Sequence, residues 1–299
     1  SPSGARAAVG WFDGEIAKLG VYDFATGKLQ KFDINASFGV CTFDCPLWLS
    51  ENEFVHVAQP RQLQKKFISY GAFQHDQMDR WARDTWRGKE AAVSVYGSGQ
   101  LKREIPIELR ASVLRVDART GQSTEIFIGE LWEASLSPDR RRLALVRDMR
   151  HLDTSDLDVL AVLGVDRVMR LEVFDLTQGT KQIVPCDSCN VTYQSLRWSP
   201  SGRKLFFATR TKHAGKQVHE HYIYDFRGSK LQKFVPEGVP FESIVDIGTI
   251  VEPFAWLTDD TPAVRITTKA PPAKEGEPKA KDHHEWFALP PGRKPVSLT

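Results

Sequence analysis

Two short patterns alternate along the chain in the same order, and this repetition constrains the fold more than any other feature. The first pattern is a turn followed by a short apolar strand, and its copies begin at Ser1, Trp48, Leu136, Trp198 and Trp256. The second pattern is an alternating strand that ends in Asp and a glycine turn. Its copies reach Asp23, Asp117, Asp175 and Asp225, and a weaker fifth copy covers 285–292. Self-similarity of this kind indicates a repeat architecture.

Each pattern has a simple physical meaning. Period-two alternation of β-branched and aromatic residues is typical of half-buried strands. In the copy that ends at Asp23, the carboxylate supplies a hydrogen-bond acceptor and Gly27 tolerates positive φ, which together favour a tight hairpin. Pro200 and Gly202 supply a fixed φ and a permissive one, which joins two further strands. We also expect the Trp or Leu before this second turn to pack between neighbouring repeats.

Four strands in a repeat of roughly 50 residues are typical of a propeller blade. The sequence therefore predicts an all-β fold, a β-propeller of four-stranded blades with about five repeats visible. The alternative is a β-sandwich whose turns resemble one another by chance. We expect residues 1–299 to form one propeller domain that begins within a blade and is incomplete, because the tetrapeptide Ser1–Gly4 recurs inside a repeat as Ser199–Gly202.

A long stretch, 60–105, interrupts the repeats and is predicted to be a mainly helical insertion. It contains Met78, Trp81, Ala82 and Thr85 at the spacing of one helix face, which predicts a short helix there. Two interpretations stay open: the helix covers a blade, or the insertion is an arm that faces a substrate. For the second interpretation, the candidate substrate-binding residues are Arg80, Arg83, Asp84, Trp86 and Arg87.

A second interruption covers 148–168 and is predicted to be a long hairpin or a packed helix. Arg150 within it is a further candidate for substrate binding, and the alternative is a solvated cluster of charges. The segment 271–281 is rich in Pro, Lys and Glu and lacks apolar anchors, which predicts a flexible loop.

The motifs of common catalytic and cofactor sites are missing from the sequence. The chain has no G-x-S-x-G elbow, no P-loop, no H-E-x-x-H and no dinucleotide fingerprint after a strand. We therefore expect no catalytic residue, no metal site and no cofactor in this chain. A net charge of +2, from 40 basic and 38 acidic side chains, predicts no binding of nucleic acid. No window approaches 18 apolar residues, so no membrane span is expected.

The four cysteines form two close pairs, Cys41 with Cys45 and Cys186 with Cys189. Two local disulfides would suit an exported or periplasmic protein. A single four-thiolate zinc site would require the two pairs to converge in space, although they fall in different repeats. Four free thiols would suit a cytosolic protein. The spacing does not decide between these interpretations.

The turns W-S-P-x-G-x-x-L-x-F and the hairpins V-x-D-x-x-x-G resemble the propeller of prolyl oligopeptidase-type serine peptidases. The copies at 198–207 and 173–179 carry this resemblance best, and it extends over nearly the whole chain. The stretch from Trp81 to Glu90, continuing to Gly97-Ser98-Gly99, is similar to a segment of the lasso-peptide isopeptidases in that family. The same propeller motifs also occur in TolB-like and other propellers without enzymatic activity.

The resemblance implies a propeller that covers an α/β-hydrolase domain, limits access to it and helps to orient a peptide substrate. The Ser-Asp-His triad would come from that domain, which is absent from these 299 residues, so no triad residue is carried over. The implied partners are a peptide and a hydrolase domain in the same gene product or in a companion fragment. The family usually has seven or eight blades, more than the repeats visible here. The alternative function is a stand-alone TolB-like or WD40-like binding propeller.

Overall fold

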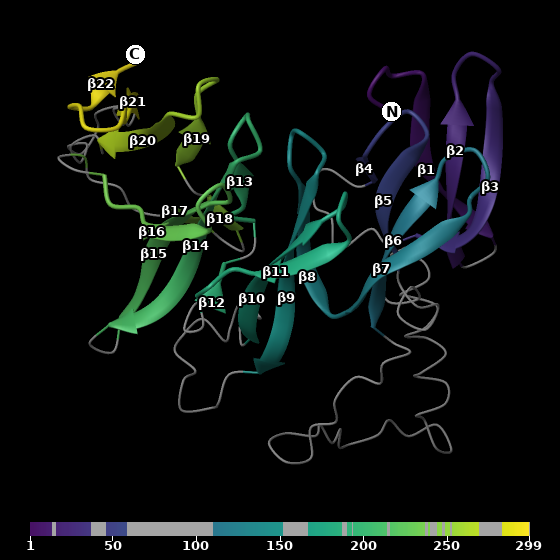
Figure 1. Ribbon diagram of the computed structural model, residues 1–299, viewed down its shortest axis with the longest axis horizontal. Helices are drawn as coiled ribbons and strands as arrows, with labels where there is room; N and C mark the ends of the chain where they lie inside the picture. The colour runs from purple at the N-terminus through teal and green to yellow at the C-terminus, as the bar shows by residue number, and fades with distance from the viewer. Residues whose placement is uncertain are drawn as a thin grey trace, which may run out of the picture. The chain divides into compact units, whose positions relative to one another are not determined.

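The computed structural model describes residues 1–13, 16–36, 46–58, 110–151, 167–186, 190–192, 194–213, 216–236, 239, 244–246, 249–251, 253–268 and 283–298. The chain divides into two compact units, Ser1–Leu131 and Trp132–Thr299. Every regular element in the described residues is a strand (Figure 1). Among these residues no helix is long and apolar enough to cross a membrane.

The first unit contains two antiparallel sheets. The three-stranded sheet is built from β1 (Arg6–Asp13), β2 (Ile16–Asp23) and β3 (Lys28–Asn35). The four-stranded sheet is built from β4 (Leu47–Trp48), β5 (Glu53–Ala58), β6 (Ala111–Asp117) and β7 (Ser123–Gly129).

The second unit contains three larger sheets and one short hairpin. The first sheet is built from β8 (Leu131–Leu136), β9 (Arg142–His151), β10 (Arg167–Asp175) and β11 (Thr180–Ile183). The next contains β12 (Asn190–Val191), β13 (Arg197–Trp198), β14 (Lys204–His213), β15 (Lys216–Asp225) and β16 (Lys230–Lys233). The hairpin pairs β17 (Ile244–Asp246) with β18 (Thr249–Val251). The last sheet contains β19 (Phe254–Trp256), β20 (Pro262–Thr268), β21 (His283–Ala288) and β22 (Val296–Ser297).

The order of strands distinguishes propeller blades from a sandwich. In the four-stranded sheets, strands that follow one another in sequence also lie side by side, as in β4-β5-β6-β7. A Greek-key sandwich would place non-consecutive strands next to each other. The predicted all-β fold with four-stranded propeller blades is therefore confirmed. The predicted helical insertion at 60–105 and the loop at 271–281 lie outside the described residues, and the prediction of a single domain stays a prediction.

The Asp-glycine hairpins form as the sequence predicts. Gly27, Gly121 and Gly179 all have φ between +66° and +74°. Each glycine N–H donates to the carbonyl of the Asp four residues earlier, at 2.8–2.9 Å. The carboxylate of that Asp also accepts a backbone N–H from within the turn, which lowers the pKa of Asp23. In the copy that follows Asp225, Ser229 takes the glycine position with a φ of +47°.

The apolar clusters lie between successive sheets of each unit. Trp48, Trp198 and Trp256, which begin copies of the first sequence pattern, each pack against one of these clusters, as predicted. In the second unit, Trp198 Nε1 donates to the Ser135 carbonyl at 3.3 Å, and Trp256 Nε1 donates to the Arg197 carbonyl at 2.9 Å. Each of these hydrogen bonds therefore joins the sheet that contains the indole to a strand of the preceding sheet.

The second interruption begins and ends in strands. β9 and β10 stay paired as far as His151 and Arg167, with an irregularity between Val168 and Met169. This pairing favours the predicted hairpin over a helix, although 152–166 lie outside the described residues. Arg150 belongs to β9 and pairs in register with Val168.

Candidate binding site

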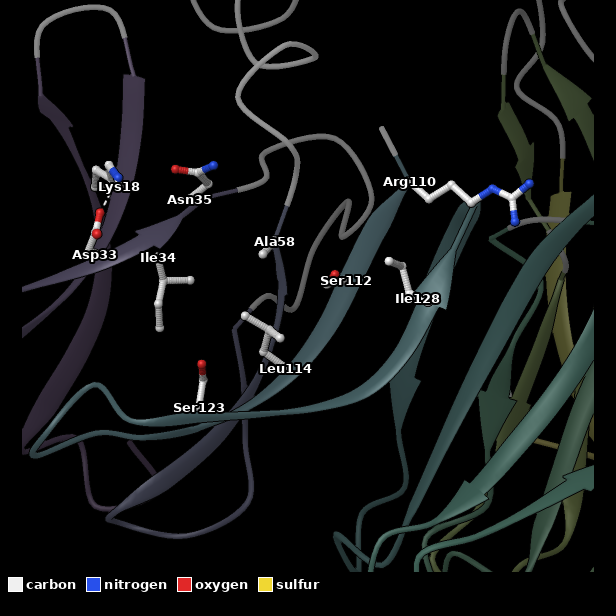
Figure 2. A pocket seen from close by; sticks show the side chains of 10 residues that line it. All are labelled: Lys18, Asp33, Ile34, Asn35, Ala58, Arg110, Ser112, Leu114, Ser123 and Ile128. Carbon is white, nitrogen blue, oxygen red and sulfur yellow. Dashed lines mark hydrogen bonds and ion pairs between the residues drawn. The ribbon is translucent and has the colours of Figure 1, made fainter. Parts of the chain in front are cut away.

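The first unit contains an open pocket of about 480 Å³ between its two sheets. Its lining combines apolar, polar and charged residues, which are Lys18, Asp33, Ile34, Asn35, Ala58, Arg110, Ser112, Leu114, Ser123 and Ile128. Figure 2 shows Lys18 and Asp33 on one side, Arg110 and Ile128 on the other, and Leu114 between them. A pocket of this volume is within the range of small-ligand sites in proteins.

A lysine–aspartate ion pair forms one side of the pocket. Lys18 on β2 donates to Asp33 on β3, and the close approach lowers the pKa of the Asp33 carboxyl. The two partners differ in environment, since the Lys18 side chain is 16 % exposed and the Asp33 side chain is 96 % exposed. The Lys18 side chain as a whole is therefore largely covered, and the carboxylate of its partner is in solvent.

Both sheets lose their regular pairing at the pocket. Between the pairs Lys18↔Asn35 and Gly20↔Lys31, β2 has one residue and β3 has three. In the second sheet, the register shifts where Val113 is followed by Leu114. Bulges bend strands and redirect side chains, and they are common beside functional sites. Here the two bulges lie at the residues of β3 and β6 that line the pocket.

Two side chains at this interface are smaller than their counterparts in the second unit. Trp48 pairs with Phe54 in the first unit, and Trp198 pairs with Leu205 in the second. These matching pairs align β5 with β14. In this alignment, His56 is equivalent to Phe207. Leu114 lies opposite His56, and Tyr222 lies opposite Phe207, so Leu114 is equivalent to Tyr222. In the second unit the rings of Phe207 and Tyr222 stack at 5.7 Å. Their counterparts in the first unit are smaller, so they fill less of the interface.

His56 is buried next to the pocket, opposite Leu114 in the β5–β6 ladder. Its Nε2 lies 3.2 Å from the carbonyl of Asn35, and its buried Nδ1 has no hydrogen-bond partner among the described residues. Burial lowers the pKa of His56 to about 4, so the ring is neutral at pH 7 and donates from Nε2. His56 therefore places a polar imidazole at a position where the second unit has the apolar ring of Phe207.

A half-buried carboxylate occupies a different position in the second unit. Glu133 on β8 accepts the backbone N–H of Gln194 at 2.5 Å. Burial raises the pKa of Glu133 to about 7, although this hydrogen bond and the nearby Arg197 act in the opposite direction. This contact fixes the segment before β13 to the preceding blade.

The described residues that line this pocket include none of those predicted to bind substrate. Arg80, Arg83, Asp84, Trp86 and Arg87 lie outside the described residues, so their role stays a prediction. For Arg150 only the backbone is described. The pocket residues were not predicted, although aligning the repeat copies places His56 against Phe207, and this difference was a usable signal.

Cys186 is the only cysteine among the described residues, and it is disulfide-bonded. It packs against the apolar cluster between the first two sheets of the second unit. Cys41, Cys45 and Cys189 lie outside the described residues, so the predicted pairing stays a prediction. The described part of the chain contains no group of three or more His, Cys, Asp or Glu residues that could hold a metal ion.

No family model matches the chain, and no curated protein matches its sequence. Several solved structures are similar. The tricorn protease is 12 % identical with a TM-score of 0.47, and the match covers 98 % of this chain and 25 % of that one. The β-propeller domain of the Trilobed protease from Pyrococcus furiosus is 14 % identical with a TM-score of 0.38, over 64 % of this chain and 49 % of that one.

A putative TolB from Agrobacterium tumefaciens is 10 % identical with a TM-score of 0.41, and the match covers 100 % of this chain and 78 % of that one. The chain thus spans a quarter of the length of the tricorn protease and about half of the Trilobed protease domain. At these identities and TM-scores, the similarities carry no argument about function.

Proposed function

We propose that residues 1–299 are the non-catalytic, substrate-gating propeller of a serine peptidase that hydrolyses amide bonds in peptides. The observation that supports this function is the open pocket of the first unit, which combines an apolar floor with charged sides. Peptides present apolar side chains beside polar backbone and charged groups, so this lining is complementary to them. The hydrolase domain that cleaves the bond would be supplied by the same gene product or by a companion fragment.

The isopeptidase subgroup is the finer part of the proposal. It depends on the segment from Trp81 to Glu90, and Arg83 and Trp86 are the residues expected to contact the peptide. Substituting both by Ala in the full-length enzyme should lower kcat/KM, whereas Arg203→Ala, at an exposed turn position, should not. An unchanged kcat/KM in the double variant would show that this segment has no role in substrate binding.

An exported or periplasmic location is a second part of the proposal. The disulfide at Cys186 supports it, because disulfides persist in oxidising compartments. Alkylation of the native protein before and after reduction, followed by mass spectrometry, should show new reactive thiols only after reduction. Four alkylated cysteines without reduction would contradict the disulfides and the location inferred from them.

The decisive experiment for the peptidase function is labelling of the complete native gene product with a fluorophosphonate, which reacts with activated serines. We expect a labelled band on a denaturing gel, at the full-length mass or as a companion fragment, and no band when the sample is heat-denatured first. The absence of label in a preparation shown to contain the complete product would exclude the peptidase. The chain would then be a stand-alone binding propeller.

A further inference from the structure

The ion pair at the pocket is asymmetric in a way that suggests a replaceable partner. Lys18 is held by β2 with only 16 % of its side chain exposed, whereas the Asp33 side chain is 96 % exposed. A lysine side chain that is mostly covered is held in one place and gains from a negative partner near its charge. An exposed carboxylate gains little from the same pair, because water solvates it equally well. Another carboxylate can therefore take the place of Asp33 at a small cost.

We propose that this pocket binds a peptide through a carboxylate that replaces Asp33 on Lys18 and an adjacent apolar side chain that packs on Ile34 and Leu114. The inference rests on the proposed function only for the choice of a peptide as the ligand. The carboxylate is either the C-terminus of the peptide or the side chain of Asp or Glu. Both sources present the same chemistry to Lys18.

The charges around the pocket are complementary to such a ligand. The lining contains two cations, Lys18 and Arg110, and one anion, Asp33. Among the described residues, none forms a hydrogen bond or ion pair with Arg110. Figure 2 shows Arg110 on the opposite side of the pocket from Lys18, with its guanidinium extending outward. With two cations and one anion, the lining carries a net positive charge, which favours an anionic ligand.

The remaining lining residues fit the rest of a peptide. Ile34, Ala58, Leu114 and Ile128 are the apolar residues of the lining and form its floor. Asn35 and the hydroxyls of Ser112 and Ser123 lie beside this floor and offer hydrogen bonds to backbone amides. Ser112 already donates to Glu125 Oε2 at 3.0 Å, which leaves the lone pairs of its oxygen as acceptors for a peptide N–H.

The binding test uses the full-length protein and three short peptides, followed by isothermal titration calorimetry. Acetyl-Ala-Ala-Leu has a free C-terminal carboxylate, its C-terminal amide has no carboxylate, and acetyl-Asp-Leu-Ala amide has only a side-chain carboxylate. We expect at least one carboxylate peptide to bind about tenfold more tightly than the neutral amide, as expected for a hydrogen bond between charged groups. Which of the two binds identifies the source. Equal affinity for all three peptides, or no binding of any, would overturn the proposal.

Four variants locate the interaction. Lys18→Met should lose the preference for carboxylate peptides, and Leu114→Tyr should weaken binding of all peptides by filling the floor. Asp33→Asn removes the competing carboxylate from an exposed site, so it should bind carboxylate peptides about threefold more tightly. Lys28→Met, at an exposed position on β3, is the matched control and should bind as the wild type does.

The Asp33→Asn variant keeps the test decisive if Lys18→Met fails to fold, because Asp33 is exposed and its loss removes no packing. Weaker or unchanged binding in Asp33→Asn would contradict the replacement of Asp33 by the ligand. The result is also separable from the proposed function. Fluorophosphonate labelling without peptide binding would leave the peptidase intact and exclude this pocket as its peptide site.

Discussion

The interface between the two sheets of the first unit and the interface between β8–β11 and β12–β16 in the second unit are built from the same repeat. In the second unit the interface contains stacked aromatic rings, with Phe207 fully buried against Tyr222. In the first unit the equivalent residues are His56 and Leu114, and a pocket of about 480 Å³ remains. The two interfaces therefore differ in the size of one pair of facing side chains, and the pocket lies at the smaller pair. The backbone pairing of these two positions is the same in both sheets.

The largest expected effect on stability comes from removing an aromatic ring from the interface of the second unit. Phe207→Ala should reduce the free energy of unfolding by about 3–5 kcal/mol, because it leaves a cavity in a fully packed core. Leu114→Ala should cost only about 1–2 kcal/mol, since this residue is half-buried and already borders a pocket. Urea unfolding followed by circular dichroism measures both. Equal losses in the two variants would contradict the difference between the interfaces.

Replacing His56 by the aromatic residue of the second unit tests the polar position directly. The pKa of about 4 in the folded state lies below the unfolded value, so the folded state resists protonation. Wild-type stability should therefore fall as the pH drops from about 6.5 to about 4, by up to about 3 kcal/mol. His56→Phe should lose this dependence and should be more stable by roughly 1 kcal/mol at pH 7, because the unpartnered Nδ1 is removed.

The control for this variant is His283→Phe at an exposed position, which should keep the wild-type pH dependence. The measurement is the melting temperature between pH 4 and pH 7, and the informative quantity is the difference from the wild type. A His56→Phe protein with the same pH dependence as the wild type would show that burial of His56 does not affect stability.

Glu133 in the second unit should show the opposite pH dependence. Its pKa of about 7 in the folded state is above the unfolded value, so the folded state retains a proton that the unfolded chain releases. Its contribution to stability is present at low pH and is lost as the pH rises from about 4.5 to about 7. Glu133→Gln keeps an acceptor for the Gln194 N–H and should be more stable than the wild type by about 1–2 kcal/mol at pH 8. A stability loss at pH 8 would mean that the charged carboxylate stabilises this contact.

The smallest effects are expected in the turns, where the two units should behave alike. Gly27→Ala in the first unit and Gly179→Ala in the second should each cost about 1 kcal/mol, because both glycines have positive φ. Ser229→Gly should stabilise by about 0.5–1 kcal/mol for the same reason. Thermal unfolding of the three variants checks this. Unequal losses for Gly27 and Gly179 would mean that the units differ in their turns as well as in their interfaces.

The turns and strands could be predicted because their causes are local in sequence. Asp23 and Gly27 are four residues apart and act on the same turn, so the chemistry of the hairpin is readable directly. The pocket could not be predicted in this way, because it joins Ile34 on one sheet to Leu114 on another and depends on two bulges. Aligning the repeat copies places His56 at the position of Phe207. This difference in side chain can be read from the sequence and points to the interface that contains the pocket.

We propose that the open interface of the first unit is the peptide site. NMR titration of the isotope-labelled full-length protein with acetyl-Ala-Ala-Leu and with acetyl-Asp-Leu-Ala amide tests this directly. With the carboxylate peptide that binds, we expect the largest saturable changes in amide shifts at Asn35, Ser112 and Leu114. The resonances of Phe207 and Tyr222 should stay unchanged. Saturable changes confined to the second unit, or no saturable changes with either peptide, would contradict the claim.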